Sequence, residues 1–424
     1  MKKYLLLLSF IVSLAVSCST NDINSRKYVE HTLNAVNKPL NNEHVYIDSN
    51  YLDAIKSFSV SYQDMLDIKA NNIYSPLSIA TCFSMAYEGA DTDTKIQLQK
   101  LLKYKDGLSY KEMTKEMLEN TSKDLKEDGK IDVSQSFFID SKYKDSIEQT
   151  YLDTLTDYYY AEAYQGDLSS DIMHELLATW INNKTNNFLN VKKEDFSDYD
   201  GIMWLVNTVY AKARWIEEFN PNLDVKDNFY NLDKSTSRRT YMRQTQDNRA
   251  LVGEDYVITY LPLNMGLKFV MLLPTGKDSS IIFDSSTLKA LLDFNSHLNE
   301  YKIYEISYKM PYFKMQKDYD LKEMFVNAGY QIPFDKDKAD FSNISKLAKL
   351  NQIHIGKATH VAGIDVNHLG VEAAAYTVID IEATSAMPEE HEKLEFTLNH
   401  PFLYSIIDRN GLPLFIGNVS TFSN

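Results

Sequence analysis

The chain has 424 residues, of which 44% are hydrophobic and 24% charged, and its formal net charge is −15 at pH 7. This hydrophobic content suffices for a large core and excludes a disordered chain. Proteins that wrap nucleic acid usually carry a basic face or stripe, and none occurs here, so we expect no nucleic-acid partner.

The N-terminal segment has the features of an export signal. Its sequence, MKKYLLLLSFIVSLAVSC, places two lysines before an apolar run too short for an ordinary transmembrane helix. The run ends in small residues before Cys18, which resembles the lipidation site of bacterial lipoproteins. That resemblance implies a signal peptide over residues 1–17 and an exported protein anchored by a lipid on Cys18, at the outer membrane and facing the periplasm or the surface. A plain secretory signal is the alternative.

Residues 18–50 are polar, rich in asparagine and weakly periodic, which predicts a flexible tether. From residue 51 to 424 no repeat, low-complexity tract or Pro/Gly/Ser linker divides the chain, so we expect one large domain. Cys82 is the second and last cysteine. No disulfide framework is therefore expected, and the apolar helical pattern around Cys82 predicts a packed side chain.

The first half of the domain predicts helices, because apolar residues recur at helical spacing over 52–59, 75–89 and 171–190. Ser75 and Pro76 form a good helix start, since serine caps free amides and proline adopts the geometry of the first turn. The second half predicts strands over 202–215, 267–274, 302–313, 351–366 and 400–422, where β-branched and aromatic residues cluster. Asn410 and Gly411 predict a hairpin turn. Helices followed by strands indicate an α+β fold.

Motifs typical of enzymes are missing from the sequence. It contains no Gly-x-Ser-x-Gly elbow, no phosphate-binding glycine loop, no paired histidines at helical spacing and no Cys-x-x-Cys. Adjacent carboxylates such as Glu217 and Glu218 would point apart on a helix or strand. We therefore expect neither catalysis nor a metal or cofactor, and His360 is expected to be structural.

The segment GVEAAAYTVIDIEATSAMPEE, residues 370–390, alternates like a strand and then ends in an acidic, proline-marked tail. In a strand, the odd-numbered residues from 371 to 381 would share one small, apolar face, and the acids Glu372, Asp380 and Glu382 would share the other. Taken alone, this pattern predicts an ordinary half-buried sheet strand. Its position, between ATHVAGIDVNHLG and LEFTLNHPFLYSII, also allows a long exposed connection between two strands.

Several motifs around this segment follow one another in a recognisable order: NNIYSPLSIATCFSMAYEGA at 71–90, TWINNKTNNFL at 179–189, MWLVNTVYAKARWIEEF at 203–219, KMPYFKMQKDYDLKEMFVNAGY at 309–330, ADFSNIS at 339–345, IHIGKATHVAGIDV at 353–366 and HPFLYSIIDRNGLPLFIGNV at 400–419. Together with GVEAAAYT at 370–377, they resemble the serpins, the serine protease inhibitor family. The resemblance covers the chain from about Tyr51 to its C-terminus.

The resemblance implies a monomeric serpin fold with three β-sheets, about nine helices and an exposed reactive loop in a metastable state. A target serine or cysteine protease would cut this loop and become covalently attached to it. The cut loop would then insert as a new central strand of the main sheet and distort the protease. The small, uncharged inward face at Val371, Ala373 and Ala375 favours an inhibitory member.

The resemblance also assigns roles to individual residues. The hinge of the loop corresponds to Gly370, Val371, Glu372, Ala373, Ala374 and Ala375. The shutter beneath the main sheet corresponds to Ser75, Ser78, Asn207 and His360, and the tryptophan at the top of the sheet, where insertion begins, to Trp215. Counting fifteen positions from Gly370 places the reactive bond between Thr384 and Ser385, although the long interval to Pro401 allows the cut to fall near Ala386 or Met387.

Four residues depart from the family pattern. Val371 replaces the usual threonine or serine, an apolar exchange that insertion should tolerate. His368 replaces a common glutamate, so a charge pair at the top of the sheet is either missing or pH-sensitive. Tyr376 is bulky where a small residue is usual, and Ala213 replaces a frequent glycine. The small residues around the reactive bond suit elastase-like proteases, and also subtilisin-like or papain-like ones. The alternatives are a non-inhibitory serpin-fold lipoprotein acting as a substrate or binding protein, and a structural or carbohydrate-binding surface lipoprotein.

Overall fold

The computed structural model describes residues 46–67, 69–125, 129–198, 201–276, 279–345, 353–371 and 391–423. The predicted signal and the site at Cys18 lie outside these residues. The α-helices within them are α2 (Ser49–Gln63), α3 (Pro76–Gly89), α4 (Thr92–Leu102), α5 (Tyr110–Thr121), α6 (Gln149–Tyr159), α7 (Asp171–Lys184), α8 (Ser285–Asp293) and α9 (Leu321–Asn327). None of these helices is long and apolar enough to cross a membrane.

The strands of the described residues form two hydrogen-bonded sheets. The nine-stranded sheet comprises β1 (Asn72–Tyr74), β6 (Val225–Tyr230), β7 (Thr236–Val252), β8 (Tyr256–Pro262), β9 (Lys268–Pro274), β10 (Lys302–Pro311), β14 (Glu392–Thr397), β15 (Phe402–Ile407) and β16 (Pro413–Val419). The seven-stranded sheet comprises β2 (Lys123–Asp124), β3 (Gly129–Asp140), β4 (Glu162–Gly166), β5 (Met203–Arg214), β11 (Phe313–Asp320), β12 (Thr359–Asn367) and β13 (Gly370–Val371).

The predicted α+β class is confirmed. The three expected sheets appear as two because β7 is long enough to belong to two groups of strands. It pairs with β10 and β6 over most of its length and with β8 only through Leu251 and Val252. This short ladder joins two otherwise separate groups into the nine-stranded sheet.

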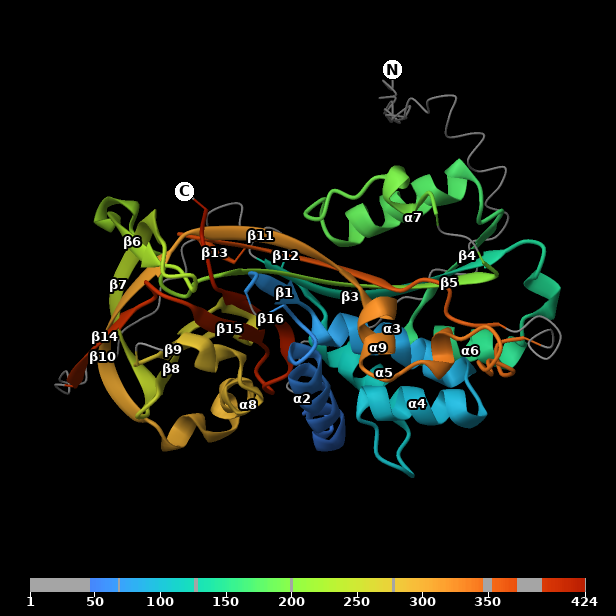
Figure 1. Cartoon of the computed structure of the whole chain (residues 1–424), viewed down its shortest axis with the longest axis horizontal. Helices are drawn as coiled ribbons and strands as arrows, with labels where there is room; N and C mark the ends of the chain where they lie inside the picture. Colours follow the sequence, from blue (N-terminus) through green and yellow to red (C-terminus); the bar gives the residue numbers. More distant parts are fainter. Residues whose placement is uncertain are drawn as a thin grey trace, which may run out of the picture.

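The seven-stranded sheet lies between two helical layers. Figure 1 shows α7 over one face and α3, α4, α5 and α6 beyond the other. Helix α3 packs against β5 and β16 and is buried on almost every side, as its apolar sequence requires. Opposite it, Trp180 of α7 and Trp204 of β5 belong to a smaller apolar cluster between α7 and the sheet.

Two predicted elements end or begin elsewhere than expected. The helix predicted over 171–190 ends at Lys184, and Asn186, Asn187 and Asn190 then adopt positive φ angles of 51°, 59° and 48°. Asparagine tolerates this region better than most residues, so the chain turns there. The strand predicted over 351–366 begins only at Thr359. The C-terminal hairpin is confirmed as β15 and β16, with Gly411 at φ 82° in the turn.

Candidate functional site

The predicted hinge begins as a short strand inside the seven-stranded sheet. Gly370 and Val371 form β13, which is antiparallel to both of its neighbours. On one side Val371 pairs with Ala213 of β5, and on the other with Val366 of β12. Val371 is 3% exposed. The rest of the predicted hinge (Glu372, Ala373, Ala374, Ala375) and the reactive bond (Thr384, Ser385) lie outside the described residues.

Gly370 occupies a position where no side chain fits. A Cβ atom built on it would lie 2.1 Å from the carbonyl oxygen of Ala213 and 2.8 Å from the Cα of Arg214. Both are backbone atoms of β5, so they cannot move aside unless the strand itself shifts. The close approach of the hinge to β5 therefore requires glycine here.

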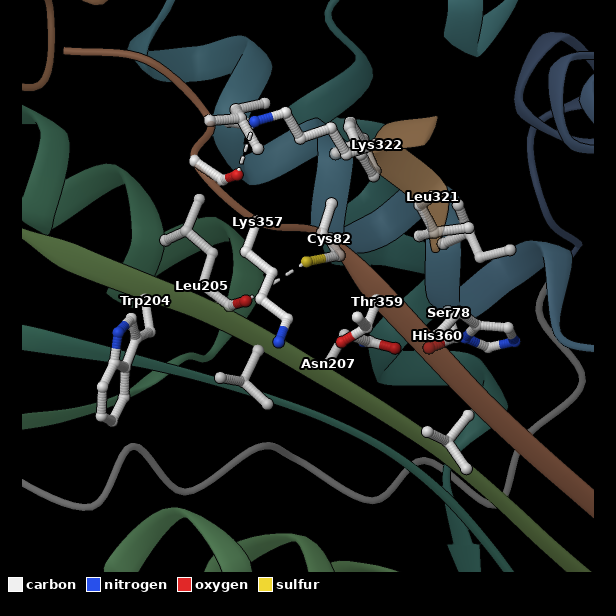
Figure 2. Close-up of a pocket in the computed structure, with 18 of the residues that line it drawn as sticks. Ser78, Cys82, Trp204, Leu205, Asn207, Leu321, Lys322, Lys357, Thr359 and His360 are labelled. Carbon is white, nitrogen blue, oxygen red and sulfur yellow. Dashed lines mark hydrogen bonds between the residues drawn. The ribbon is translucent and has the colours of Figure 1, made fainter. Parts of the chain in front are cut away.

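Beyond β13, a cleft separates β5 from β12. Within the described residues these two strands share no ladder and are linked only through β13. The cleft encloses a cavity of about 1550 Å³, lined by residues 203–209 of β5, by residues 358–362 leading into and forming β12, and by α3 beneath. Figure 2 shows Leu205, Asn207, Thr359 and His360 along its two sides. Among the described strands, the sheet is thus open at its centre.

Several buried polar atoms in and beside this cleft have no hydrogen-bond partner among the described residues. The side-chain amides of Gln135 and Asn207, and the hydroxyl of Thr208, make no hydrogen bond within the part of the chain that the structure describes. Gln135 on β3 is 1% exposed and lies directly opposite Asn207 on β5. Buried polar groups are almost always paired, and leaving one unpaired costs about 1–3 kcal/mol. The open sheet therefore presents donors and acceptors that a further strand could satisfy.

The four predicted shutter residues all line this cavity. The backbone N–H of Ser75 donates to Nε2 of His360 over 3.0 Å, and the Ser75 hydroxyl oxygen accepts from the backbone N–H of Ser78 over 3.1 Å. These contacts tie the start of α3 to β12. Asn207 lies in the same cavity but joins neither contact. Burial lowers the pKa of His360 to about 3, so its ring is neutral and accepts the hydrogen bond from the Ser75 N–H.

Cys82 lies in the cleft wall rather than simply inside a helix bundle. Its Sγ donates to the carbonyl oxygen of Leu205 over 3.4 Å (Figure 2), and burial raises the pKa of its thiol to about 12. The thiol is therefore a poor nucleophile. The described residues hold no group of three or more His, Cys, Asp or Glu placed to bind a metal ion.

Trp215 holds the turn that leads into β13. Its indole N–H donates to the carbonyl oxygen of Asn367 over 2.8 Å, and its backbone N–H donates to that of Leu369 over 3.1 Å. The ring also makes edge contacts with Phe219 and Phe269. Trp215 thus lies where the predicted hinge enters the sheet, at the end of β5.

His368, at the same turn, pairs with an acid. Its Nε2 lies 2.9 Å from Oδ1 of Asp224, and the hydroxyl of Tyr312 is hydrogen-bonded to its ring. The sequence indicates that His368 departs from the family pattern, but it does not indicate either of the residues that His368 contacts. Asp224 is 144 residues away and Tyr312 is 56. Gln135 was not predicted as part of the site. Its position between the inward-facing Val133 and Phe137 of β3 indicates a buried polar residue and could have identified it.

Comparison with known proteins identifies the family to which this fold belongs. The family model for serpins (serine protease inhibitors) matches residues 53–422. The chain is 28% identical to human serpin B13 over 83% of its length and 93% of that protein's, and 25% identical to an uncharacterized serpin-like protein of Methanosarcina acetivorans over 82% and 81%. Its fold is similar to the crystal structure of the thermophilic serpin tengpin in the native state, with a TM-score of 0.74, 23% identity and coverage of 92% and 99%. The chain belongs to the serpin family.

Proposed function

We propose that this serpin is a suicide-substrate inhibitor that traps a serine or cysteine endopeptidase as a covalent complex by inserting its cut loop between β5 and β12. Members of the family are generally protease inhibitors that bind target proteases and are not themselves enzymes. The observation that carries the proposal for this chain is the position of β13. The first two hinge residues already form a rung between the two strands that flank the cleft.

The register of β13 predicts where the rest of the loop would go. If the strand continued without a bulge, residues 372–381 would lie opposite 212–203 of β5, and residues 372–378 opposite 365–359 of β12. Those edges are the ones that border the cavity. Each backbone hydrogen bond gained there would contribute about 0.5–1.5 kcal/mol net.

The same register would place a polar residue of the loop between two residues of the predicted shutter. Six residues beyond Val371, Thr377 would lie between Asn207 on β5 and His360 on β12. Gln135 lies next in this row, opposite Asn207. A threonine hydroxyl both donates and accepts, so it could satisfy the Asn207 amide, which has no partner among the described residues.

The two faces of the inserted strand also fit their surroundings. Ala373 would face the core between Ala211 and Ile364, both buried, as Val371 does between its own neighbours. Glu372 would lie on the other face, opposite Lys212. A charge at residue 373 would be buried without a partner, whereas the charge at residue 372 would not.

The proposed trap requires that acyl transfer to the protease is completed and that hydrolysis of the resulting acyl link is prevented. The nucleophile of the protease, a serine hydroxyl or cysteine thiol, attacks the carbonyl carbon of Thr384. The peptide bond to Ser385 breaks, the nucleophile's proton ends on the new amino group of Ser385, and Thr384 remains as an ester or thioester on the protease. Insertion would carry the attached protease away before water completes hydrolysis. The small residues at the bond favour an elastase-like or subtilisin-like target.

We also propose that the inhibitor acts outside the cytoplasm, as a monomer anchored by a lipid on Cys18 to a bacterial outer membrane. The sequence pattern of residues 1–18 supports this, and the part of the predicted tether that precedes α2 would link the lipid to the domain. Metabolic labelling with a fatty-acid analogue tests it. We expect label in the full chain and none after Cys18→Ser, and a labelled C18S chain would contradict the anchor.

A denaturant-resistant complex tests the inhibitory function. The soluble domain is mixed with elastase-like, subtilisin-like and papain-like proteases and resolved under denaturing conditions. We expect a band at the mass of the protease plus the inhibitor without its C-terminal fragment, for at least one of them, and mass spectrometry of the released C-terminal fragment then identifies the cut bond. Clean cleavage by every protease without such a band would favour the alternative, a non-inhibitory serpin-fold substrate or binding protein.

A further inference from the structure

The segment that leads into β12 is held by α9. The backbone N–H of Leu321 donates to the carbonyl oxygen of Ala358 over 2.9 Å, and Nζ of Lys322 donates to that of Gly356 over 2.8 Å. Both donors lie in the first turn of α9. They fasten residues 356–358 to a helix that contacts β12.

One ion pair joins this segment to the other side of the cleft. Nζ of Lys357 donates to both Oδ1 and Oδ2 of Asp198, over 2.6 Å each. Lys357 precedes β12, whereas Asp198 lies between the 3-10 helix η3 (Lys193–Phe196) and β5, on the connection from α7. Both residues line the cavity, and Figure 2 shows Lys357 in it with Leu205 and Thr359. The ion pair therefore links the two chain segments that enter the flanking strands.

The ion pair lies at the end of the cleft farthest from β13. If the register of β13 continued, Lys357 would be level with Trp204, nine residues beyond the pairs that Val371 makes with Ala213 and Val366. A strand rises about 3.3 Å per residue, so about 30 Å separate these two links across the cleft. Between them the described parts of β5 and β12 share no ladder. A strand that extends β13 would therefore reach the ion pair last.

The contact is electrostatic and partly exposed. The hydrogen bonds from Lys357 lower the pKa of Asp198, so the carboxylate is charged at neutral pH. The Lys357 and Asp198 side chains are 35% and 70% exposed. An ion pair of this exposure contributes little to global stability and is weakened by salt. Its loss should therefore change the opening of the cleft without unfolding the chain.

We propose that the ion pair between Lys357 and Asp198 is a strap that holds the far end of the cleft closed in the intact chain and opens to admit a further strand. Neighbouring strands of a sheet lie about 4.8 Å apart, so a strand between β5 and β12 needs that spacing on each of its sides. An ammonium group bound to both oxygens of Asp198 resists this separation until the contact breaks. The role of the strap in trapping rests on the proposed function, whereas its effect on the closed cleft does not.

Labelling of Cys82 tests the strap without any protease. In a Cys18→Ser background Cys82 is the only thiol of the chain, and it lines the same cavity. We expect a small maleimide to label Lys357→Met about threefold faster than the parent, because the cleft opens more often. Loss of a cation cannot itself speed labelling, since it disfavours the thiolate. Lys193→Met is the matched control, because it removes an ion pair at 2.8 Å with Asp171 that lies on one side of the cleft only.

Charge reversal and salt separate the ion pair from the bulk of the lysine side chain. Lys357→Glu should label faster than Lys357→Met, because two carboxylates then repel each other. Adding Asp198→Lys should return the rate to within about twofold of the parent. Raising the salt concentration to about 1 M should speed labelling of the parent and leave Lys357→Met unchanged. Parent-like labelling of both Lys357→Met and Lys357→Glu would overturn the proposal, and so would a double variant that labels as fast as Lys357→Glu.

The rate of trapping tests the functional consequence. For a protease that forms the covalent complex, we expect the limiting rate of complex formation at saturating inhibitor to be about threefold higher in Lys357→Met, with Lys193→Met like the parent. An equal or lower rate in Lys357→Met would contradict the role of the strap in insertion. Failure of the parent chain to trap any protease would refute the proposed function, while labelling of Cys82 would still decide whether the strap closes the cleft.

Discussion

The backbone N–H of Ser75 donates to Nε2 of His360 over 3.0 Å, so a neutral imidazole joins the first turn of α3 to β12 across the cleft. The acceptor nitrogen is lost on protonation, and burial of the ring lowers its pKa to about 3. The shutter and the cap of α3 thus share one titrating group.

The stability of the chain should therefore fall in acid through His360. Its pKa is lower folded than unfolded, so the unfolded chain binds more protons and the contribution of His360 is complete above the unfolded pKa, about 6.5. It is lost as pH falls from about 6.5 toward 3, with a slope of up to about 1.4 kcal/mol per pH unit. Denaturant unfolding of the parent chain and His360→Gln across this range measures the difference. Equal slopes in the two proteins would rule out the neutral acceptor.

A charge on the inward face of the loop should convert the proposed inhibitor into a substrate. In Ala373→Glu the carboxylate would be buried between Ala211 and Ile364, and an unpaired buried charge costs several kcal/mol. We expect loop cleavage at the parent rate but little covalent complex. Ala373→Ser, which is small and uncharged, is the control and should still trap. Normal trapping by Ala373→Glu would show that residue 373 does not enter the core.

Gly370→Ala should disrupt the entry of the hinge. Its Cβ would overlap the Ala213 carbonyl oxygen at 2.1 Å, so Gly370 and Val371 would have to leave β5. We expect faster amide exchange at Val371 and less efficient trapping. Gly356→Ala is the matched control, since a Cβ there meets no atom within 4 Å. If Gly370→Ala and Gly356→Ala show the same amide exchange and the same trapping efficiency, the close approach of Gly370 to β5 does not contribute to function.

Cys82 should report whether the cleft is filled. Its thiol lines the cavity below β5 and, without Cys18, is the only thiol in the soluble domain. A pKa of about 12 makes labelling slow in the intact chain. We expect a small maleimide to label Cys82 at least about tenfold more slowly after the loop is cut, because insertion covers the cavity and restricts local opening. Equal labelling rates before and after cleavage would indicate that the cavity stays open.

Much of this account could be predicted from the sequence because local patterns determine it. The Ser75 and Pro76 helix start, the hairpin at Asn410 and Gly411 and the α+β class all rest on short-range signals, and the structure contains them. The family motifs added an order that periodicity alone could not give, and the match over residues 53–422 confirms that resemblance.

The pairings between distant residues could not be predicted. The bond between Ser75 and His360 spans 285 residues, and the contact of His368 with Asp224 spans 144. A single sequence records no such proximity. The open cleft also could not be predicted, because the sequence from Met203 to Arg214 is typical of a central strand whether or not both of its edges are paired. The early end of α7 reflects asparagine turn preferences that the apolar spacing concealed.

The central claim is that the cut loop becomes a strand between β5 and β12, and the crystal structure of the loop-cleaved chain tests it most directly. We predict residues 372–381 in register with 212–203 of β5, with the Thr377 hydroxyl between Asn207 and His360 and the amide of Asn207 hydrogen-bonded. A cleaved chain in which β5 and β12 pair directly, or in which the cleft between them stays empty, would contradict the account.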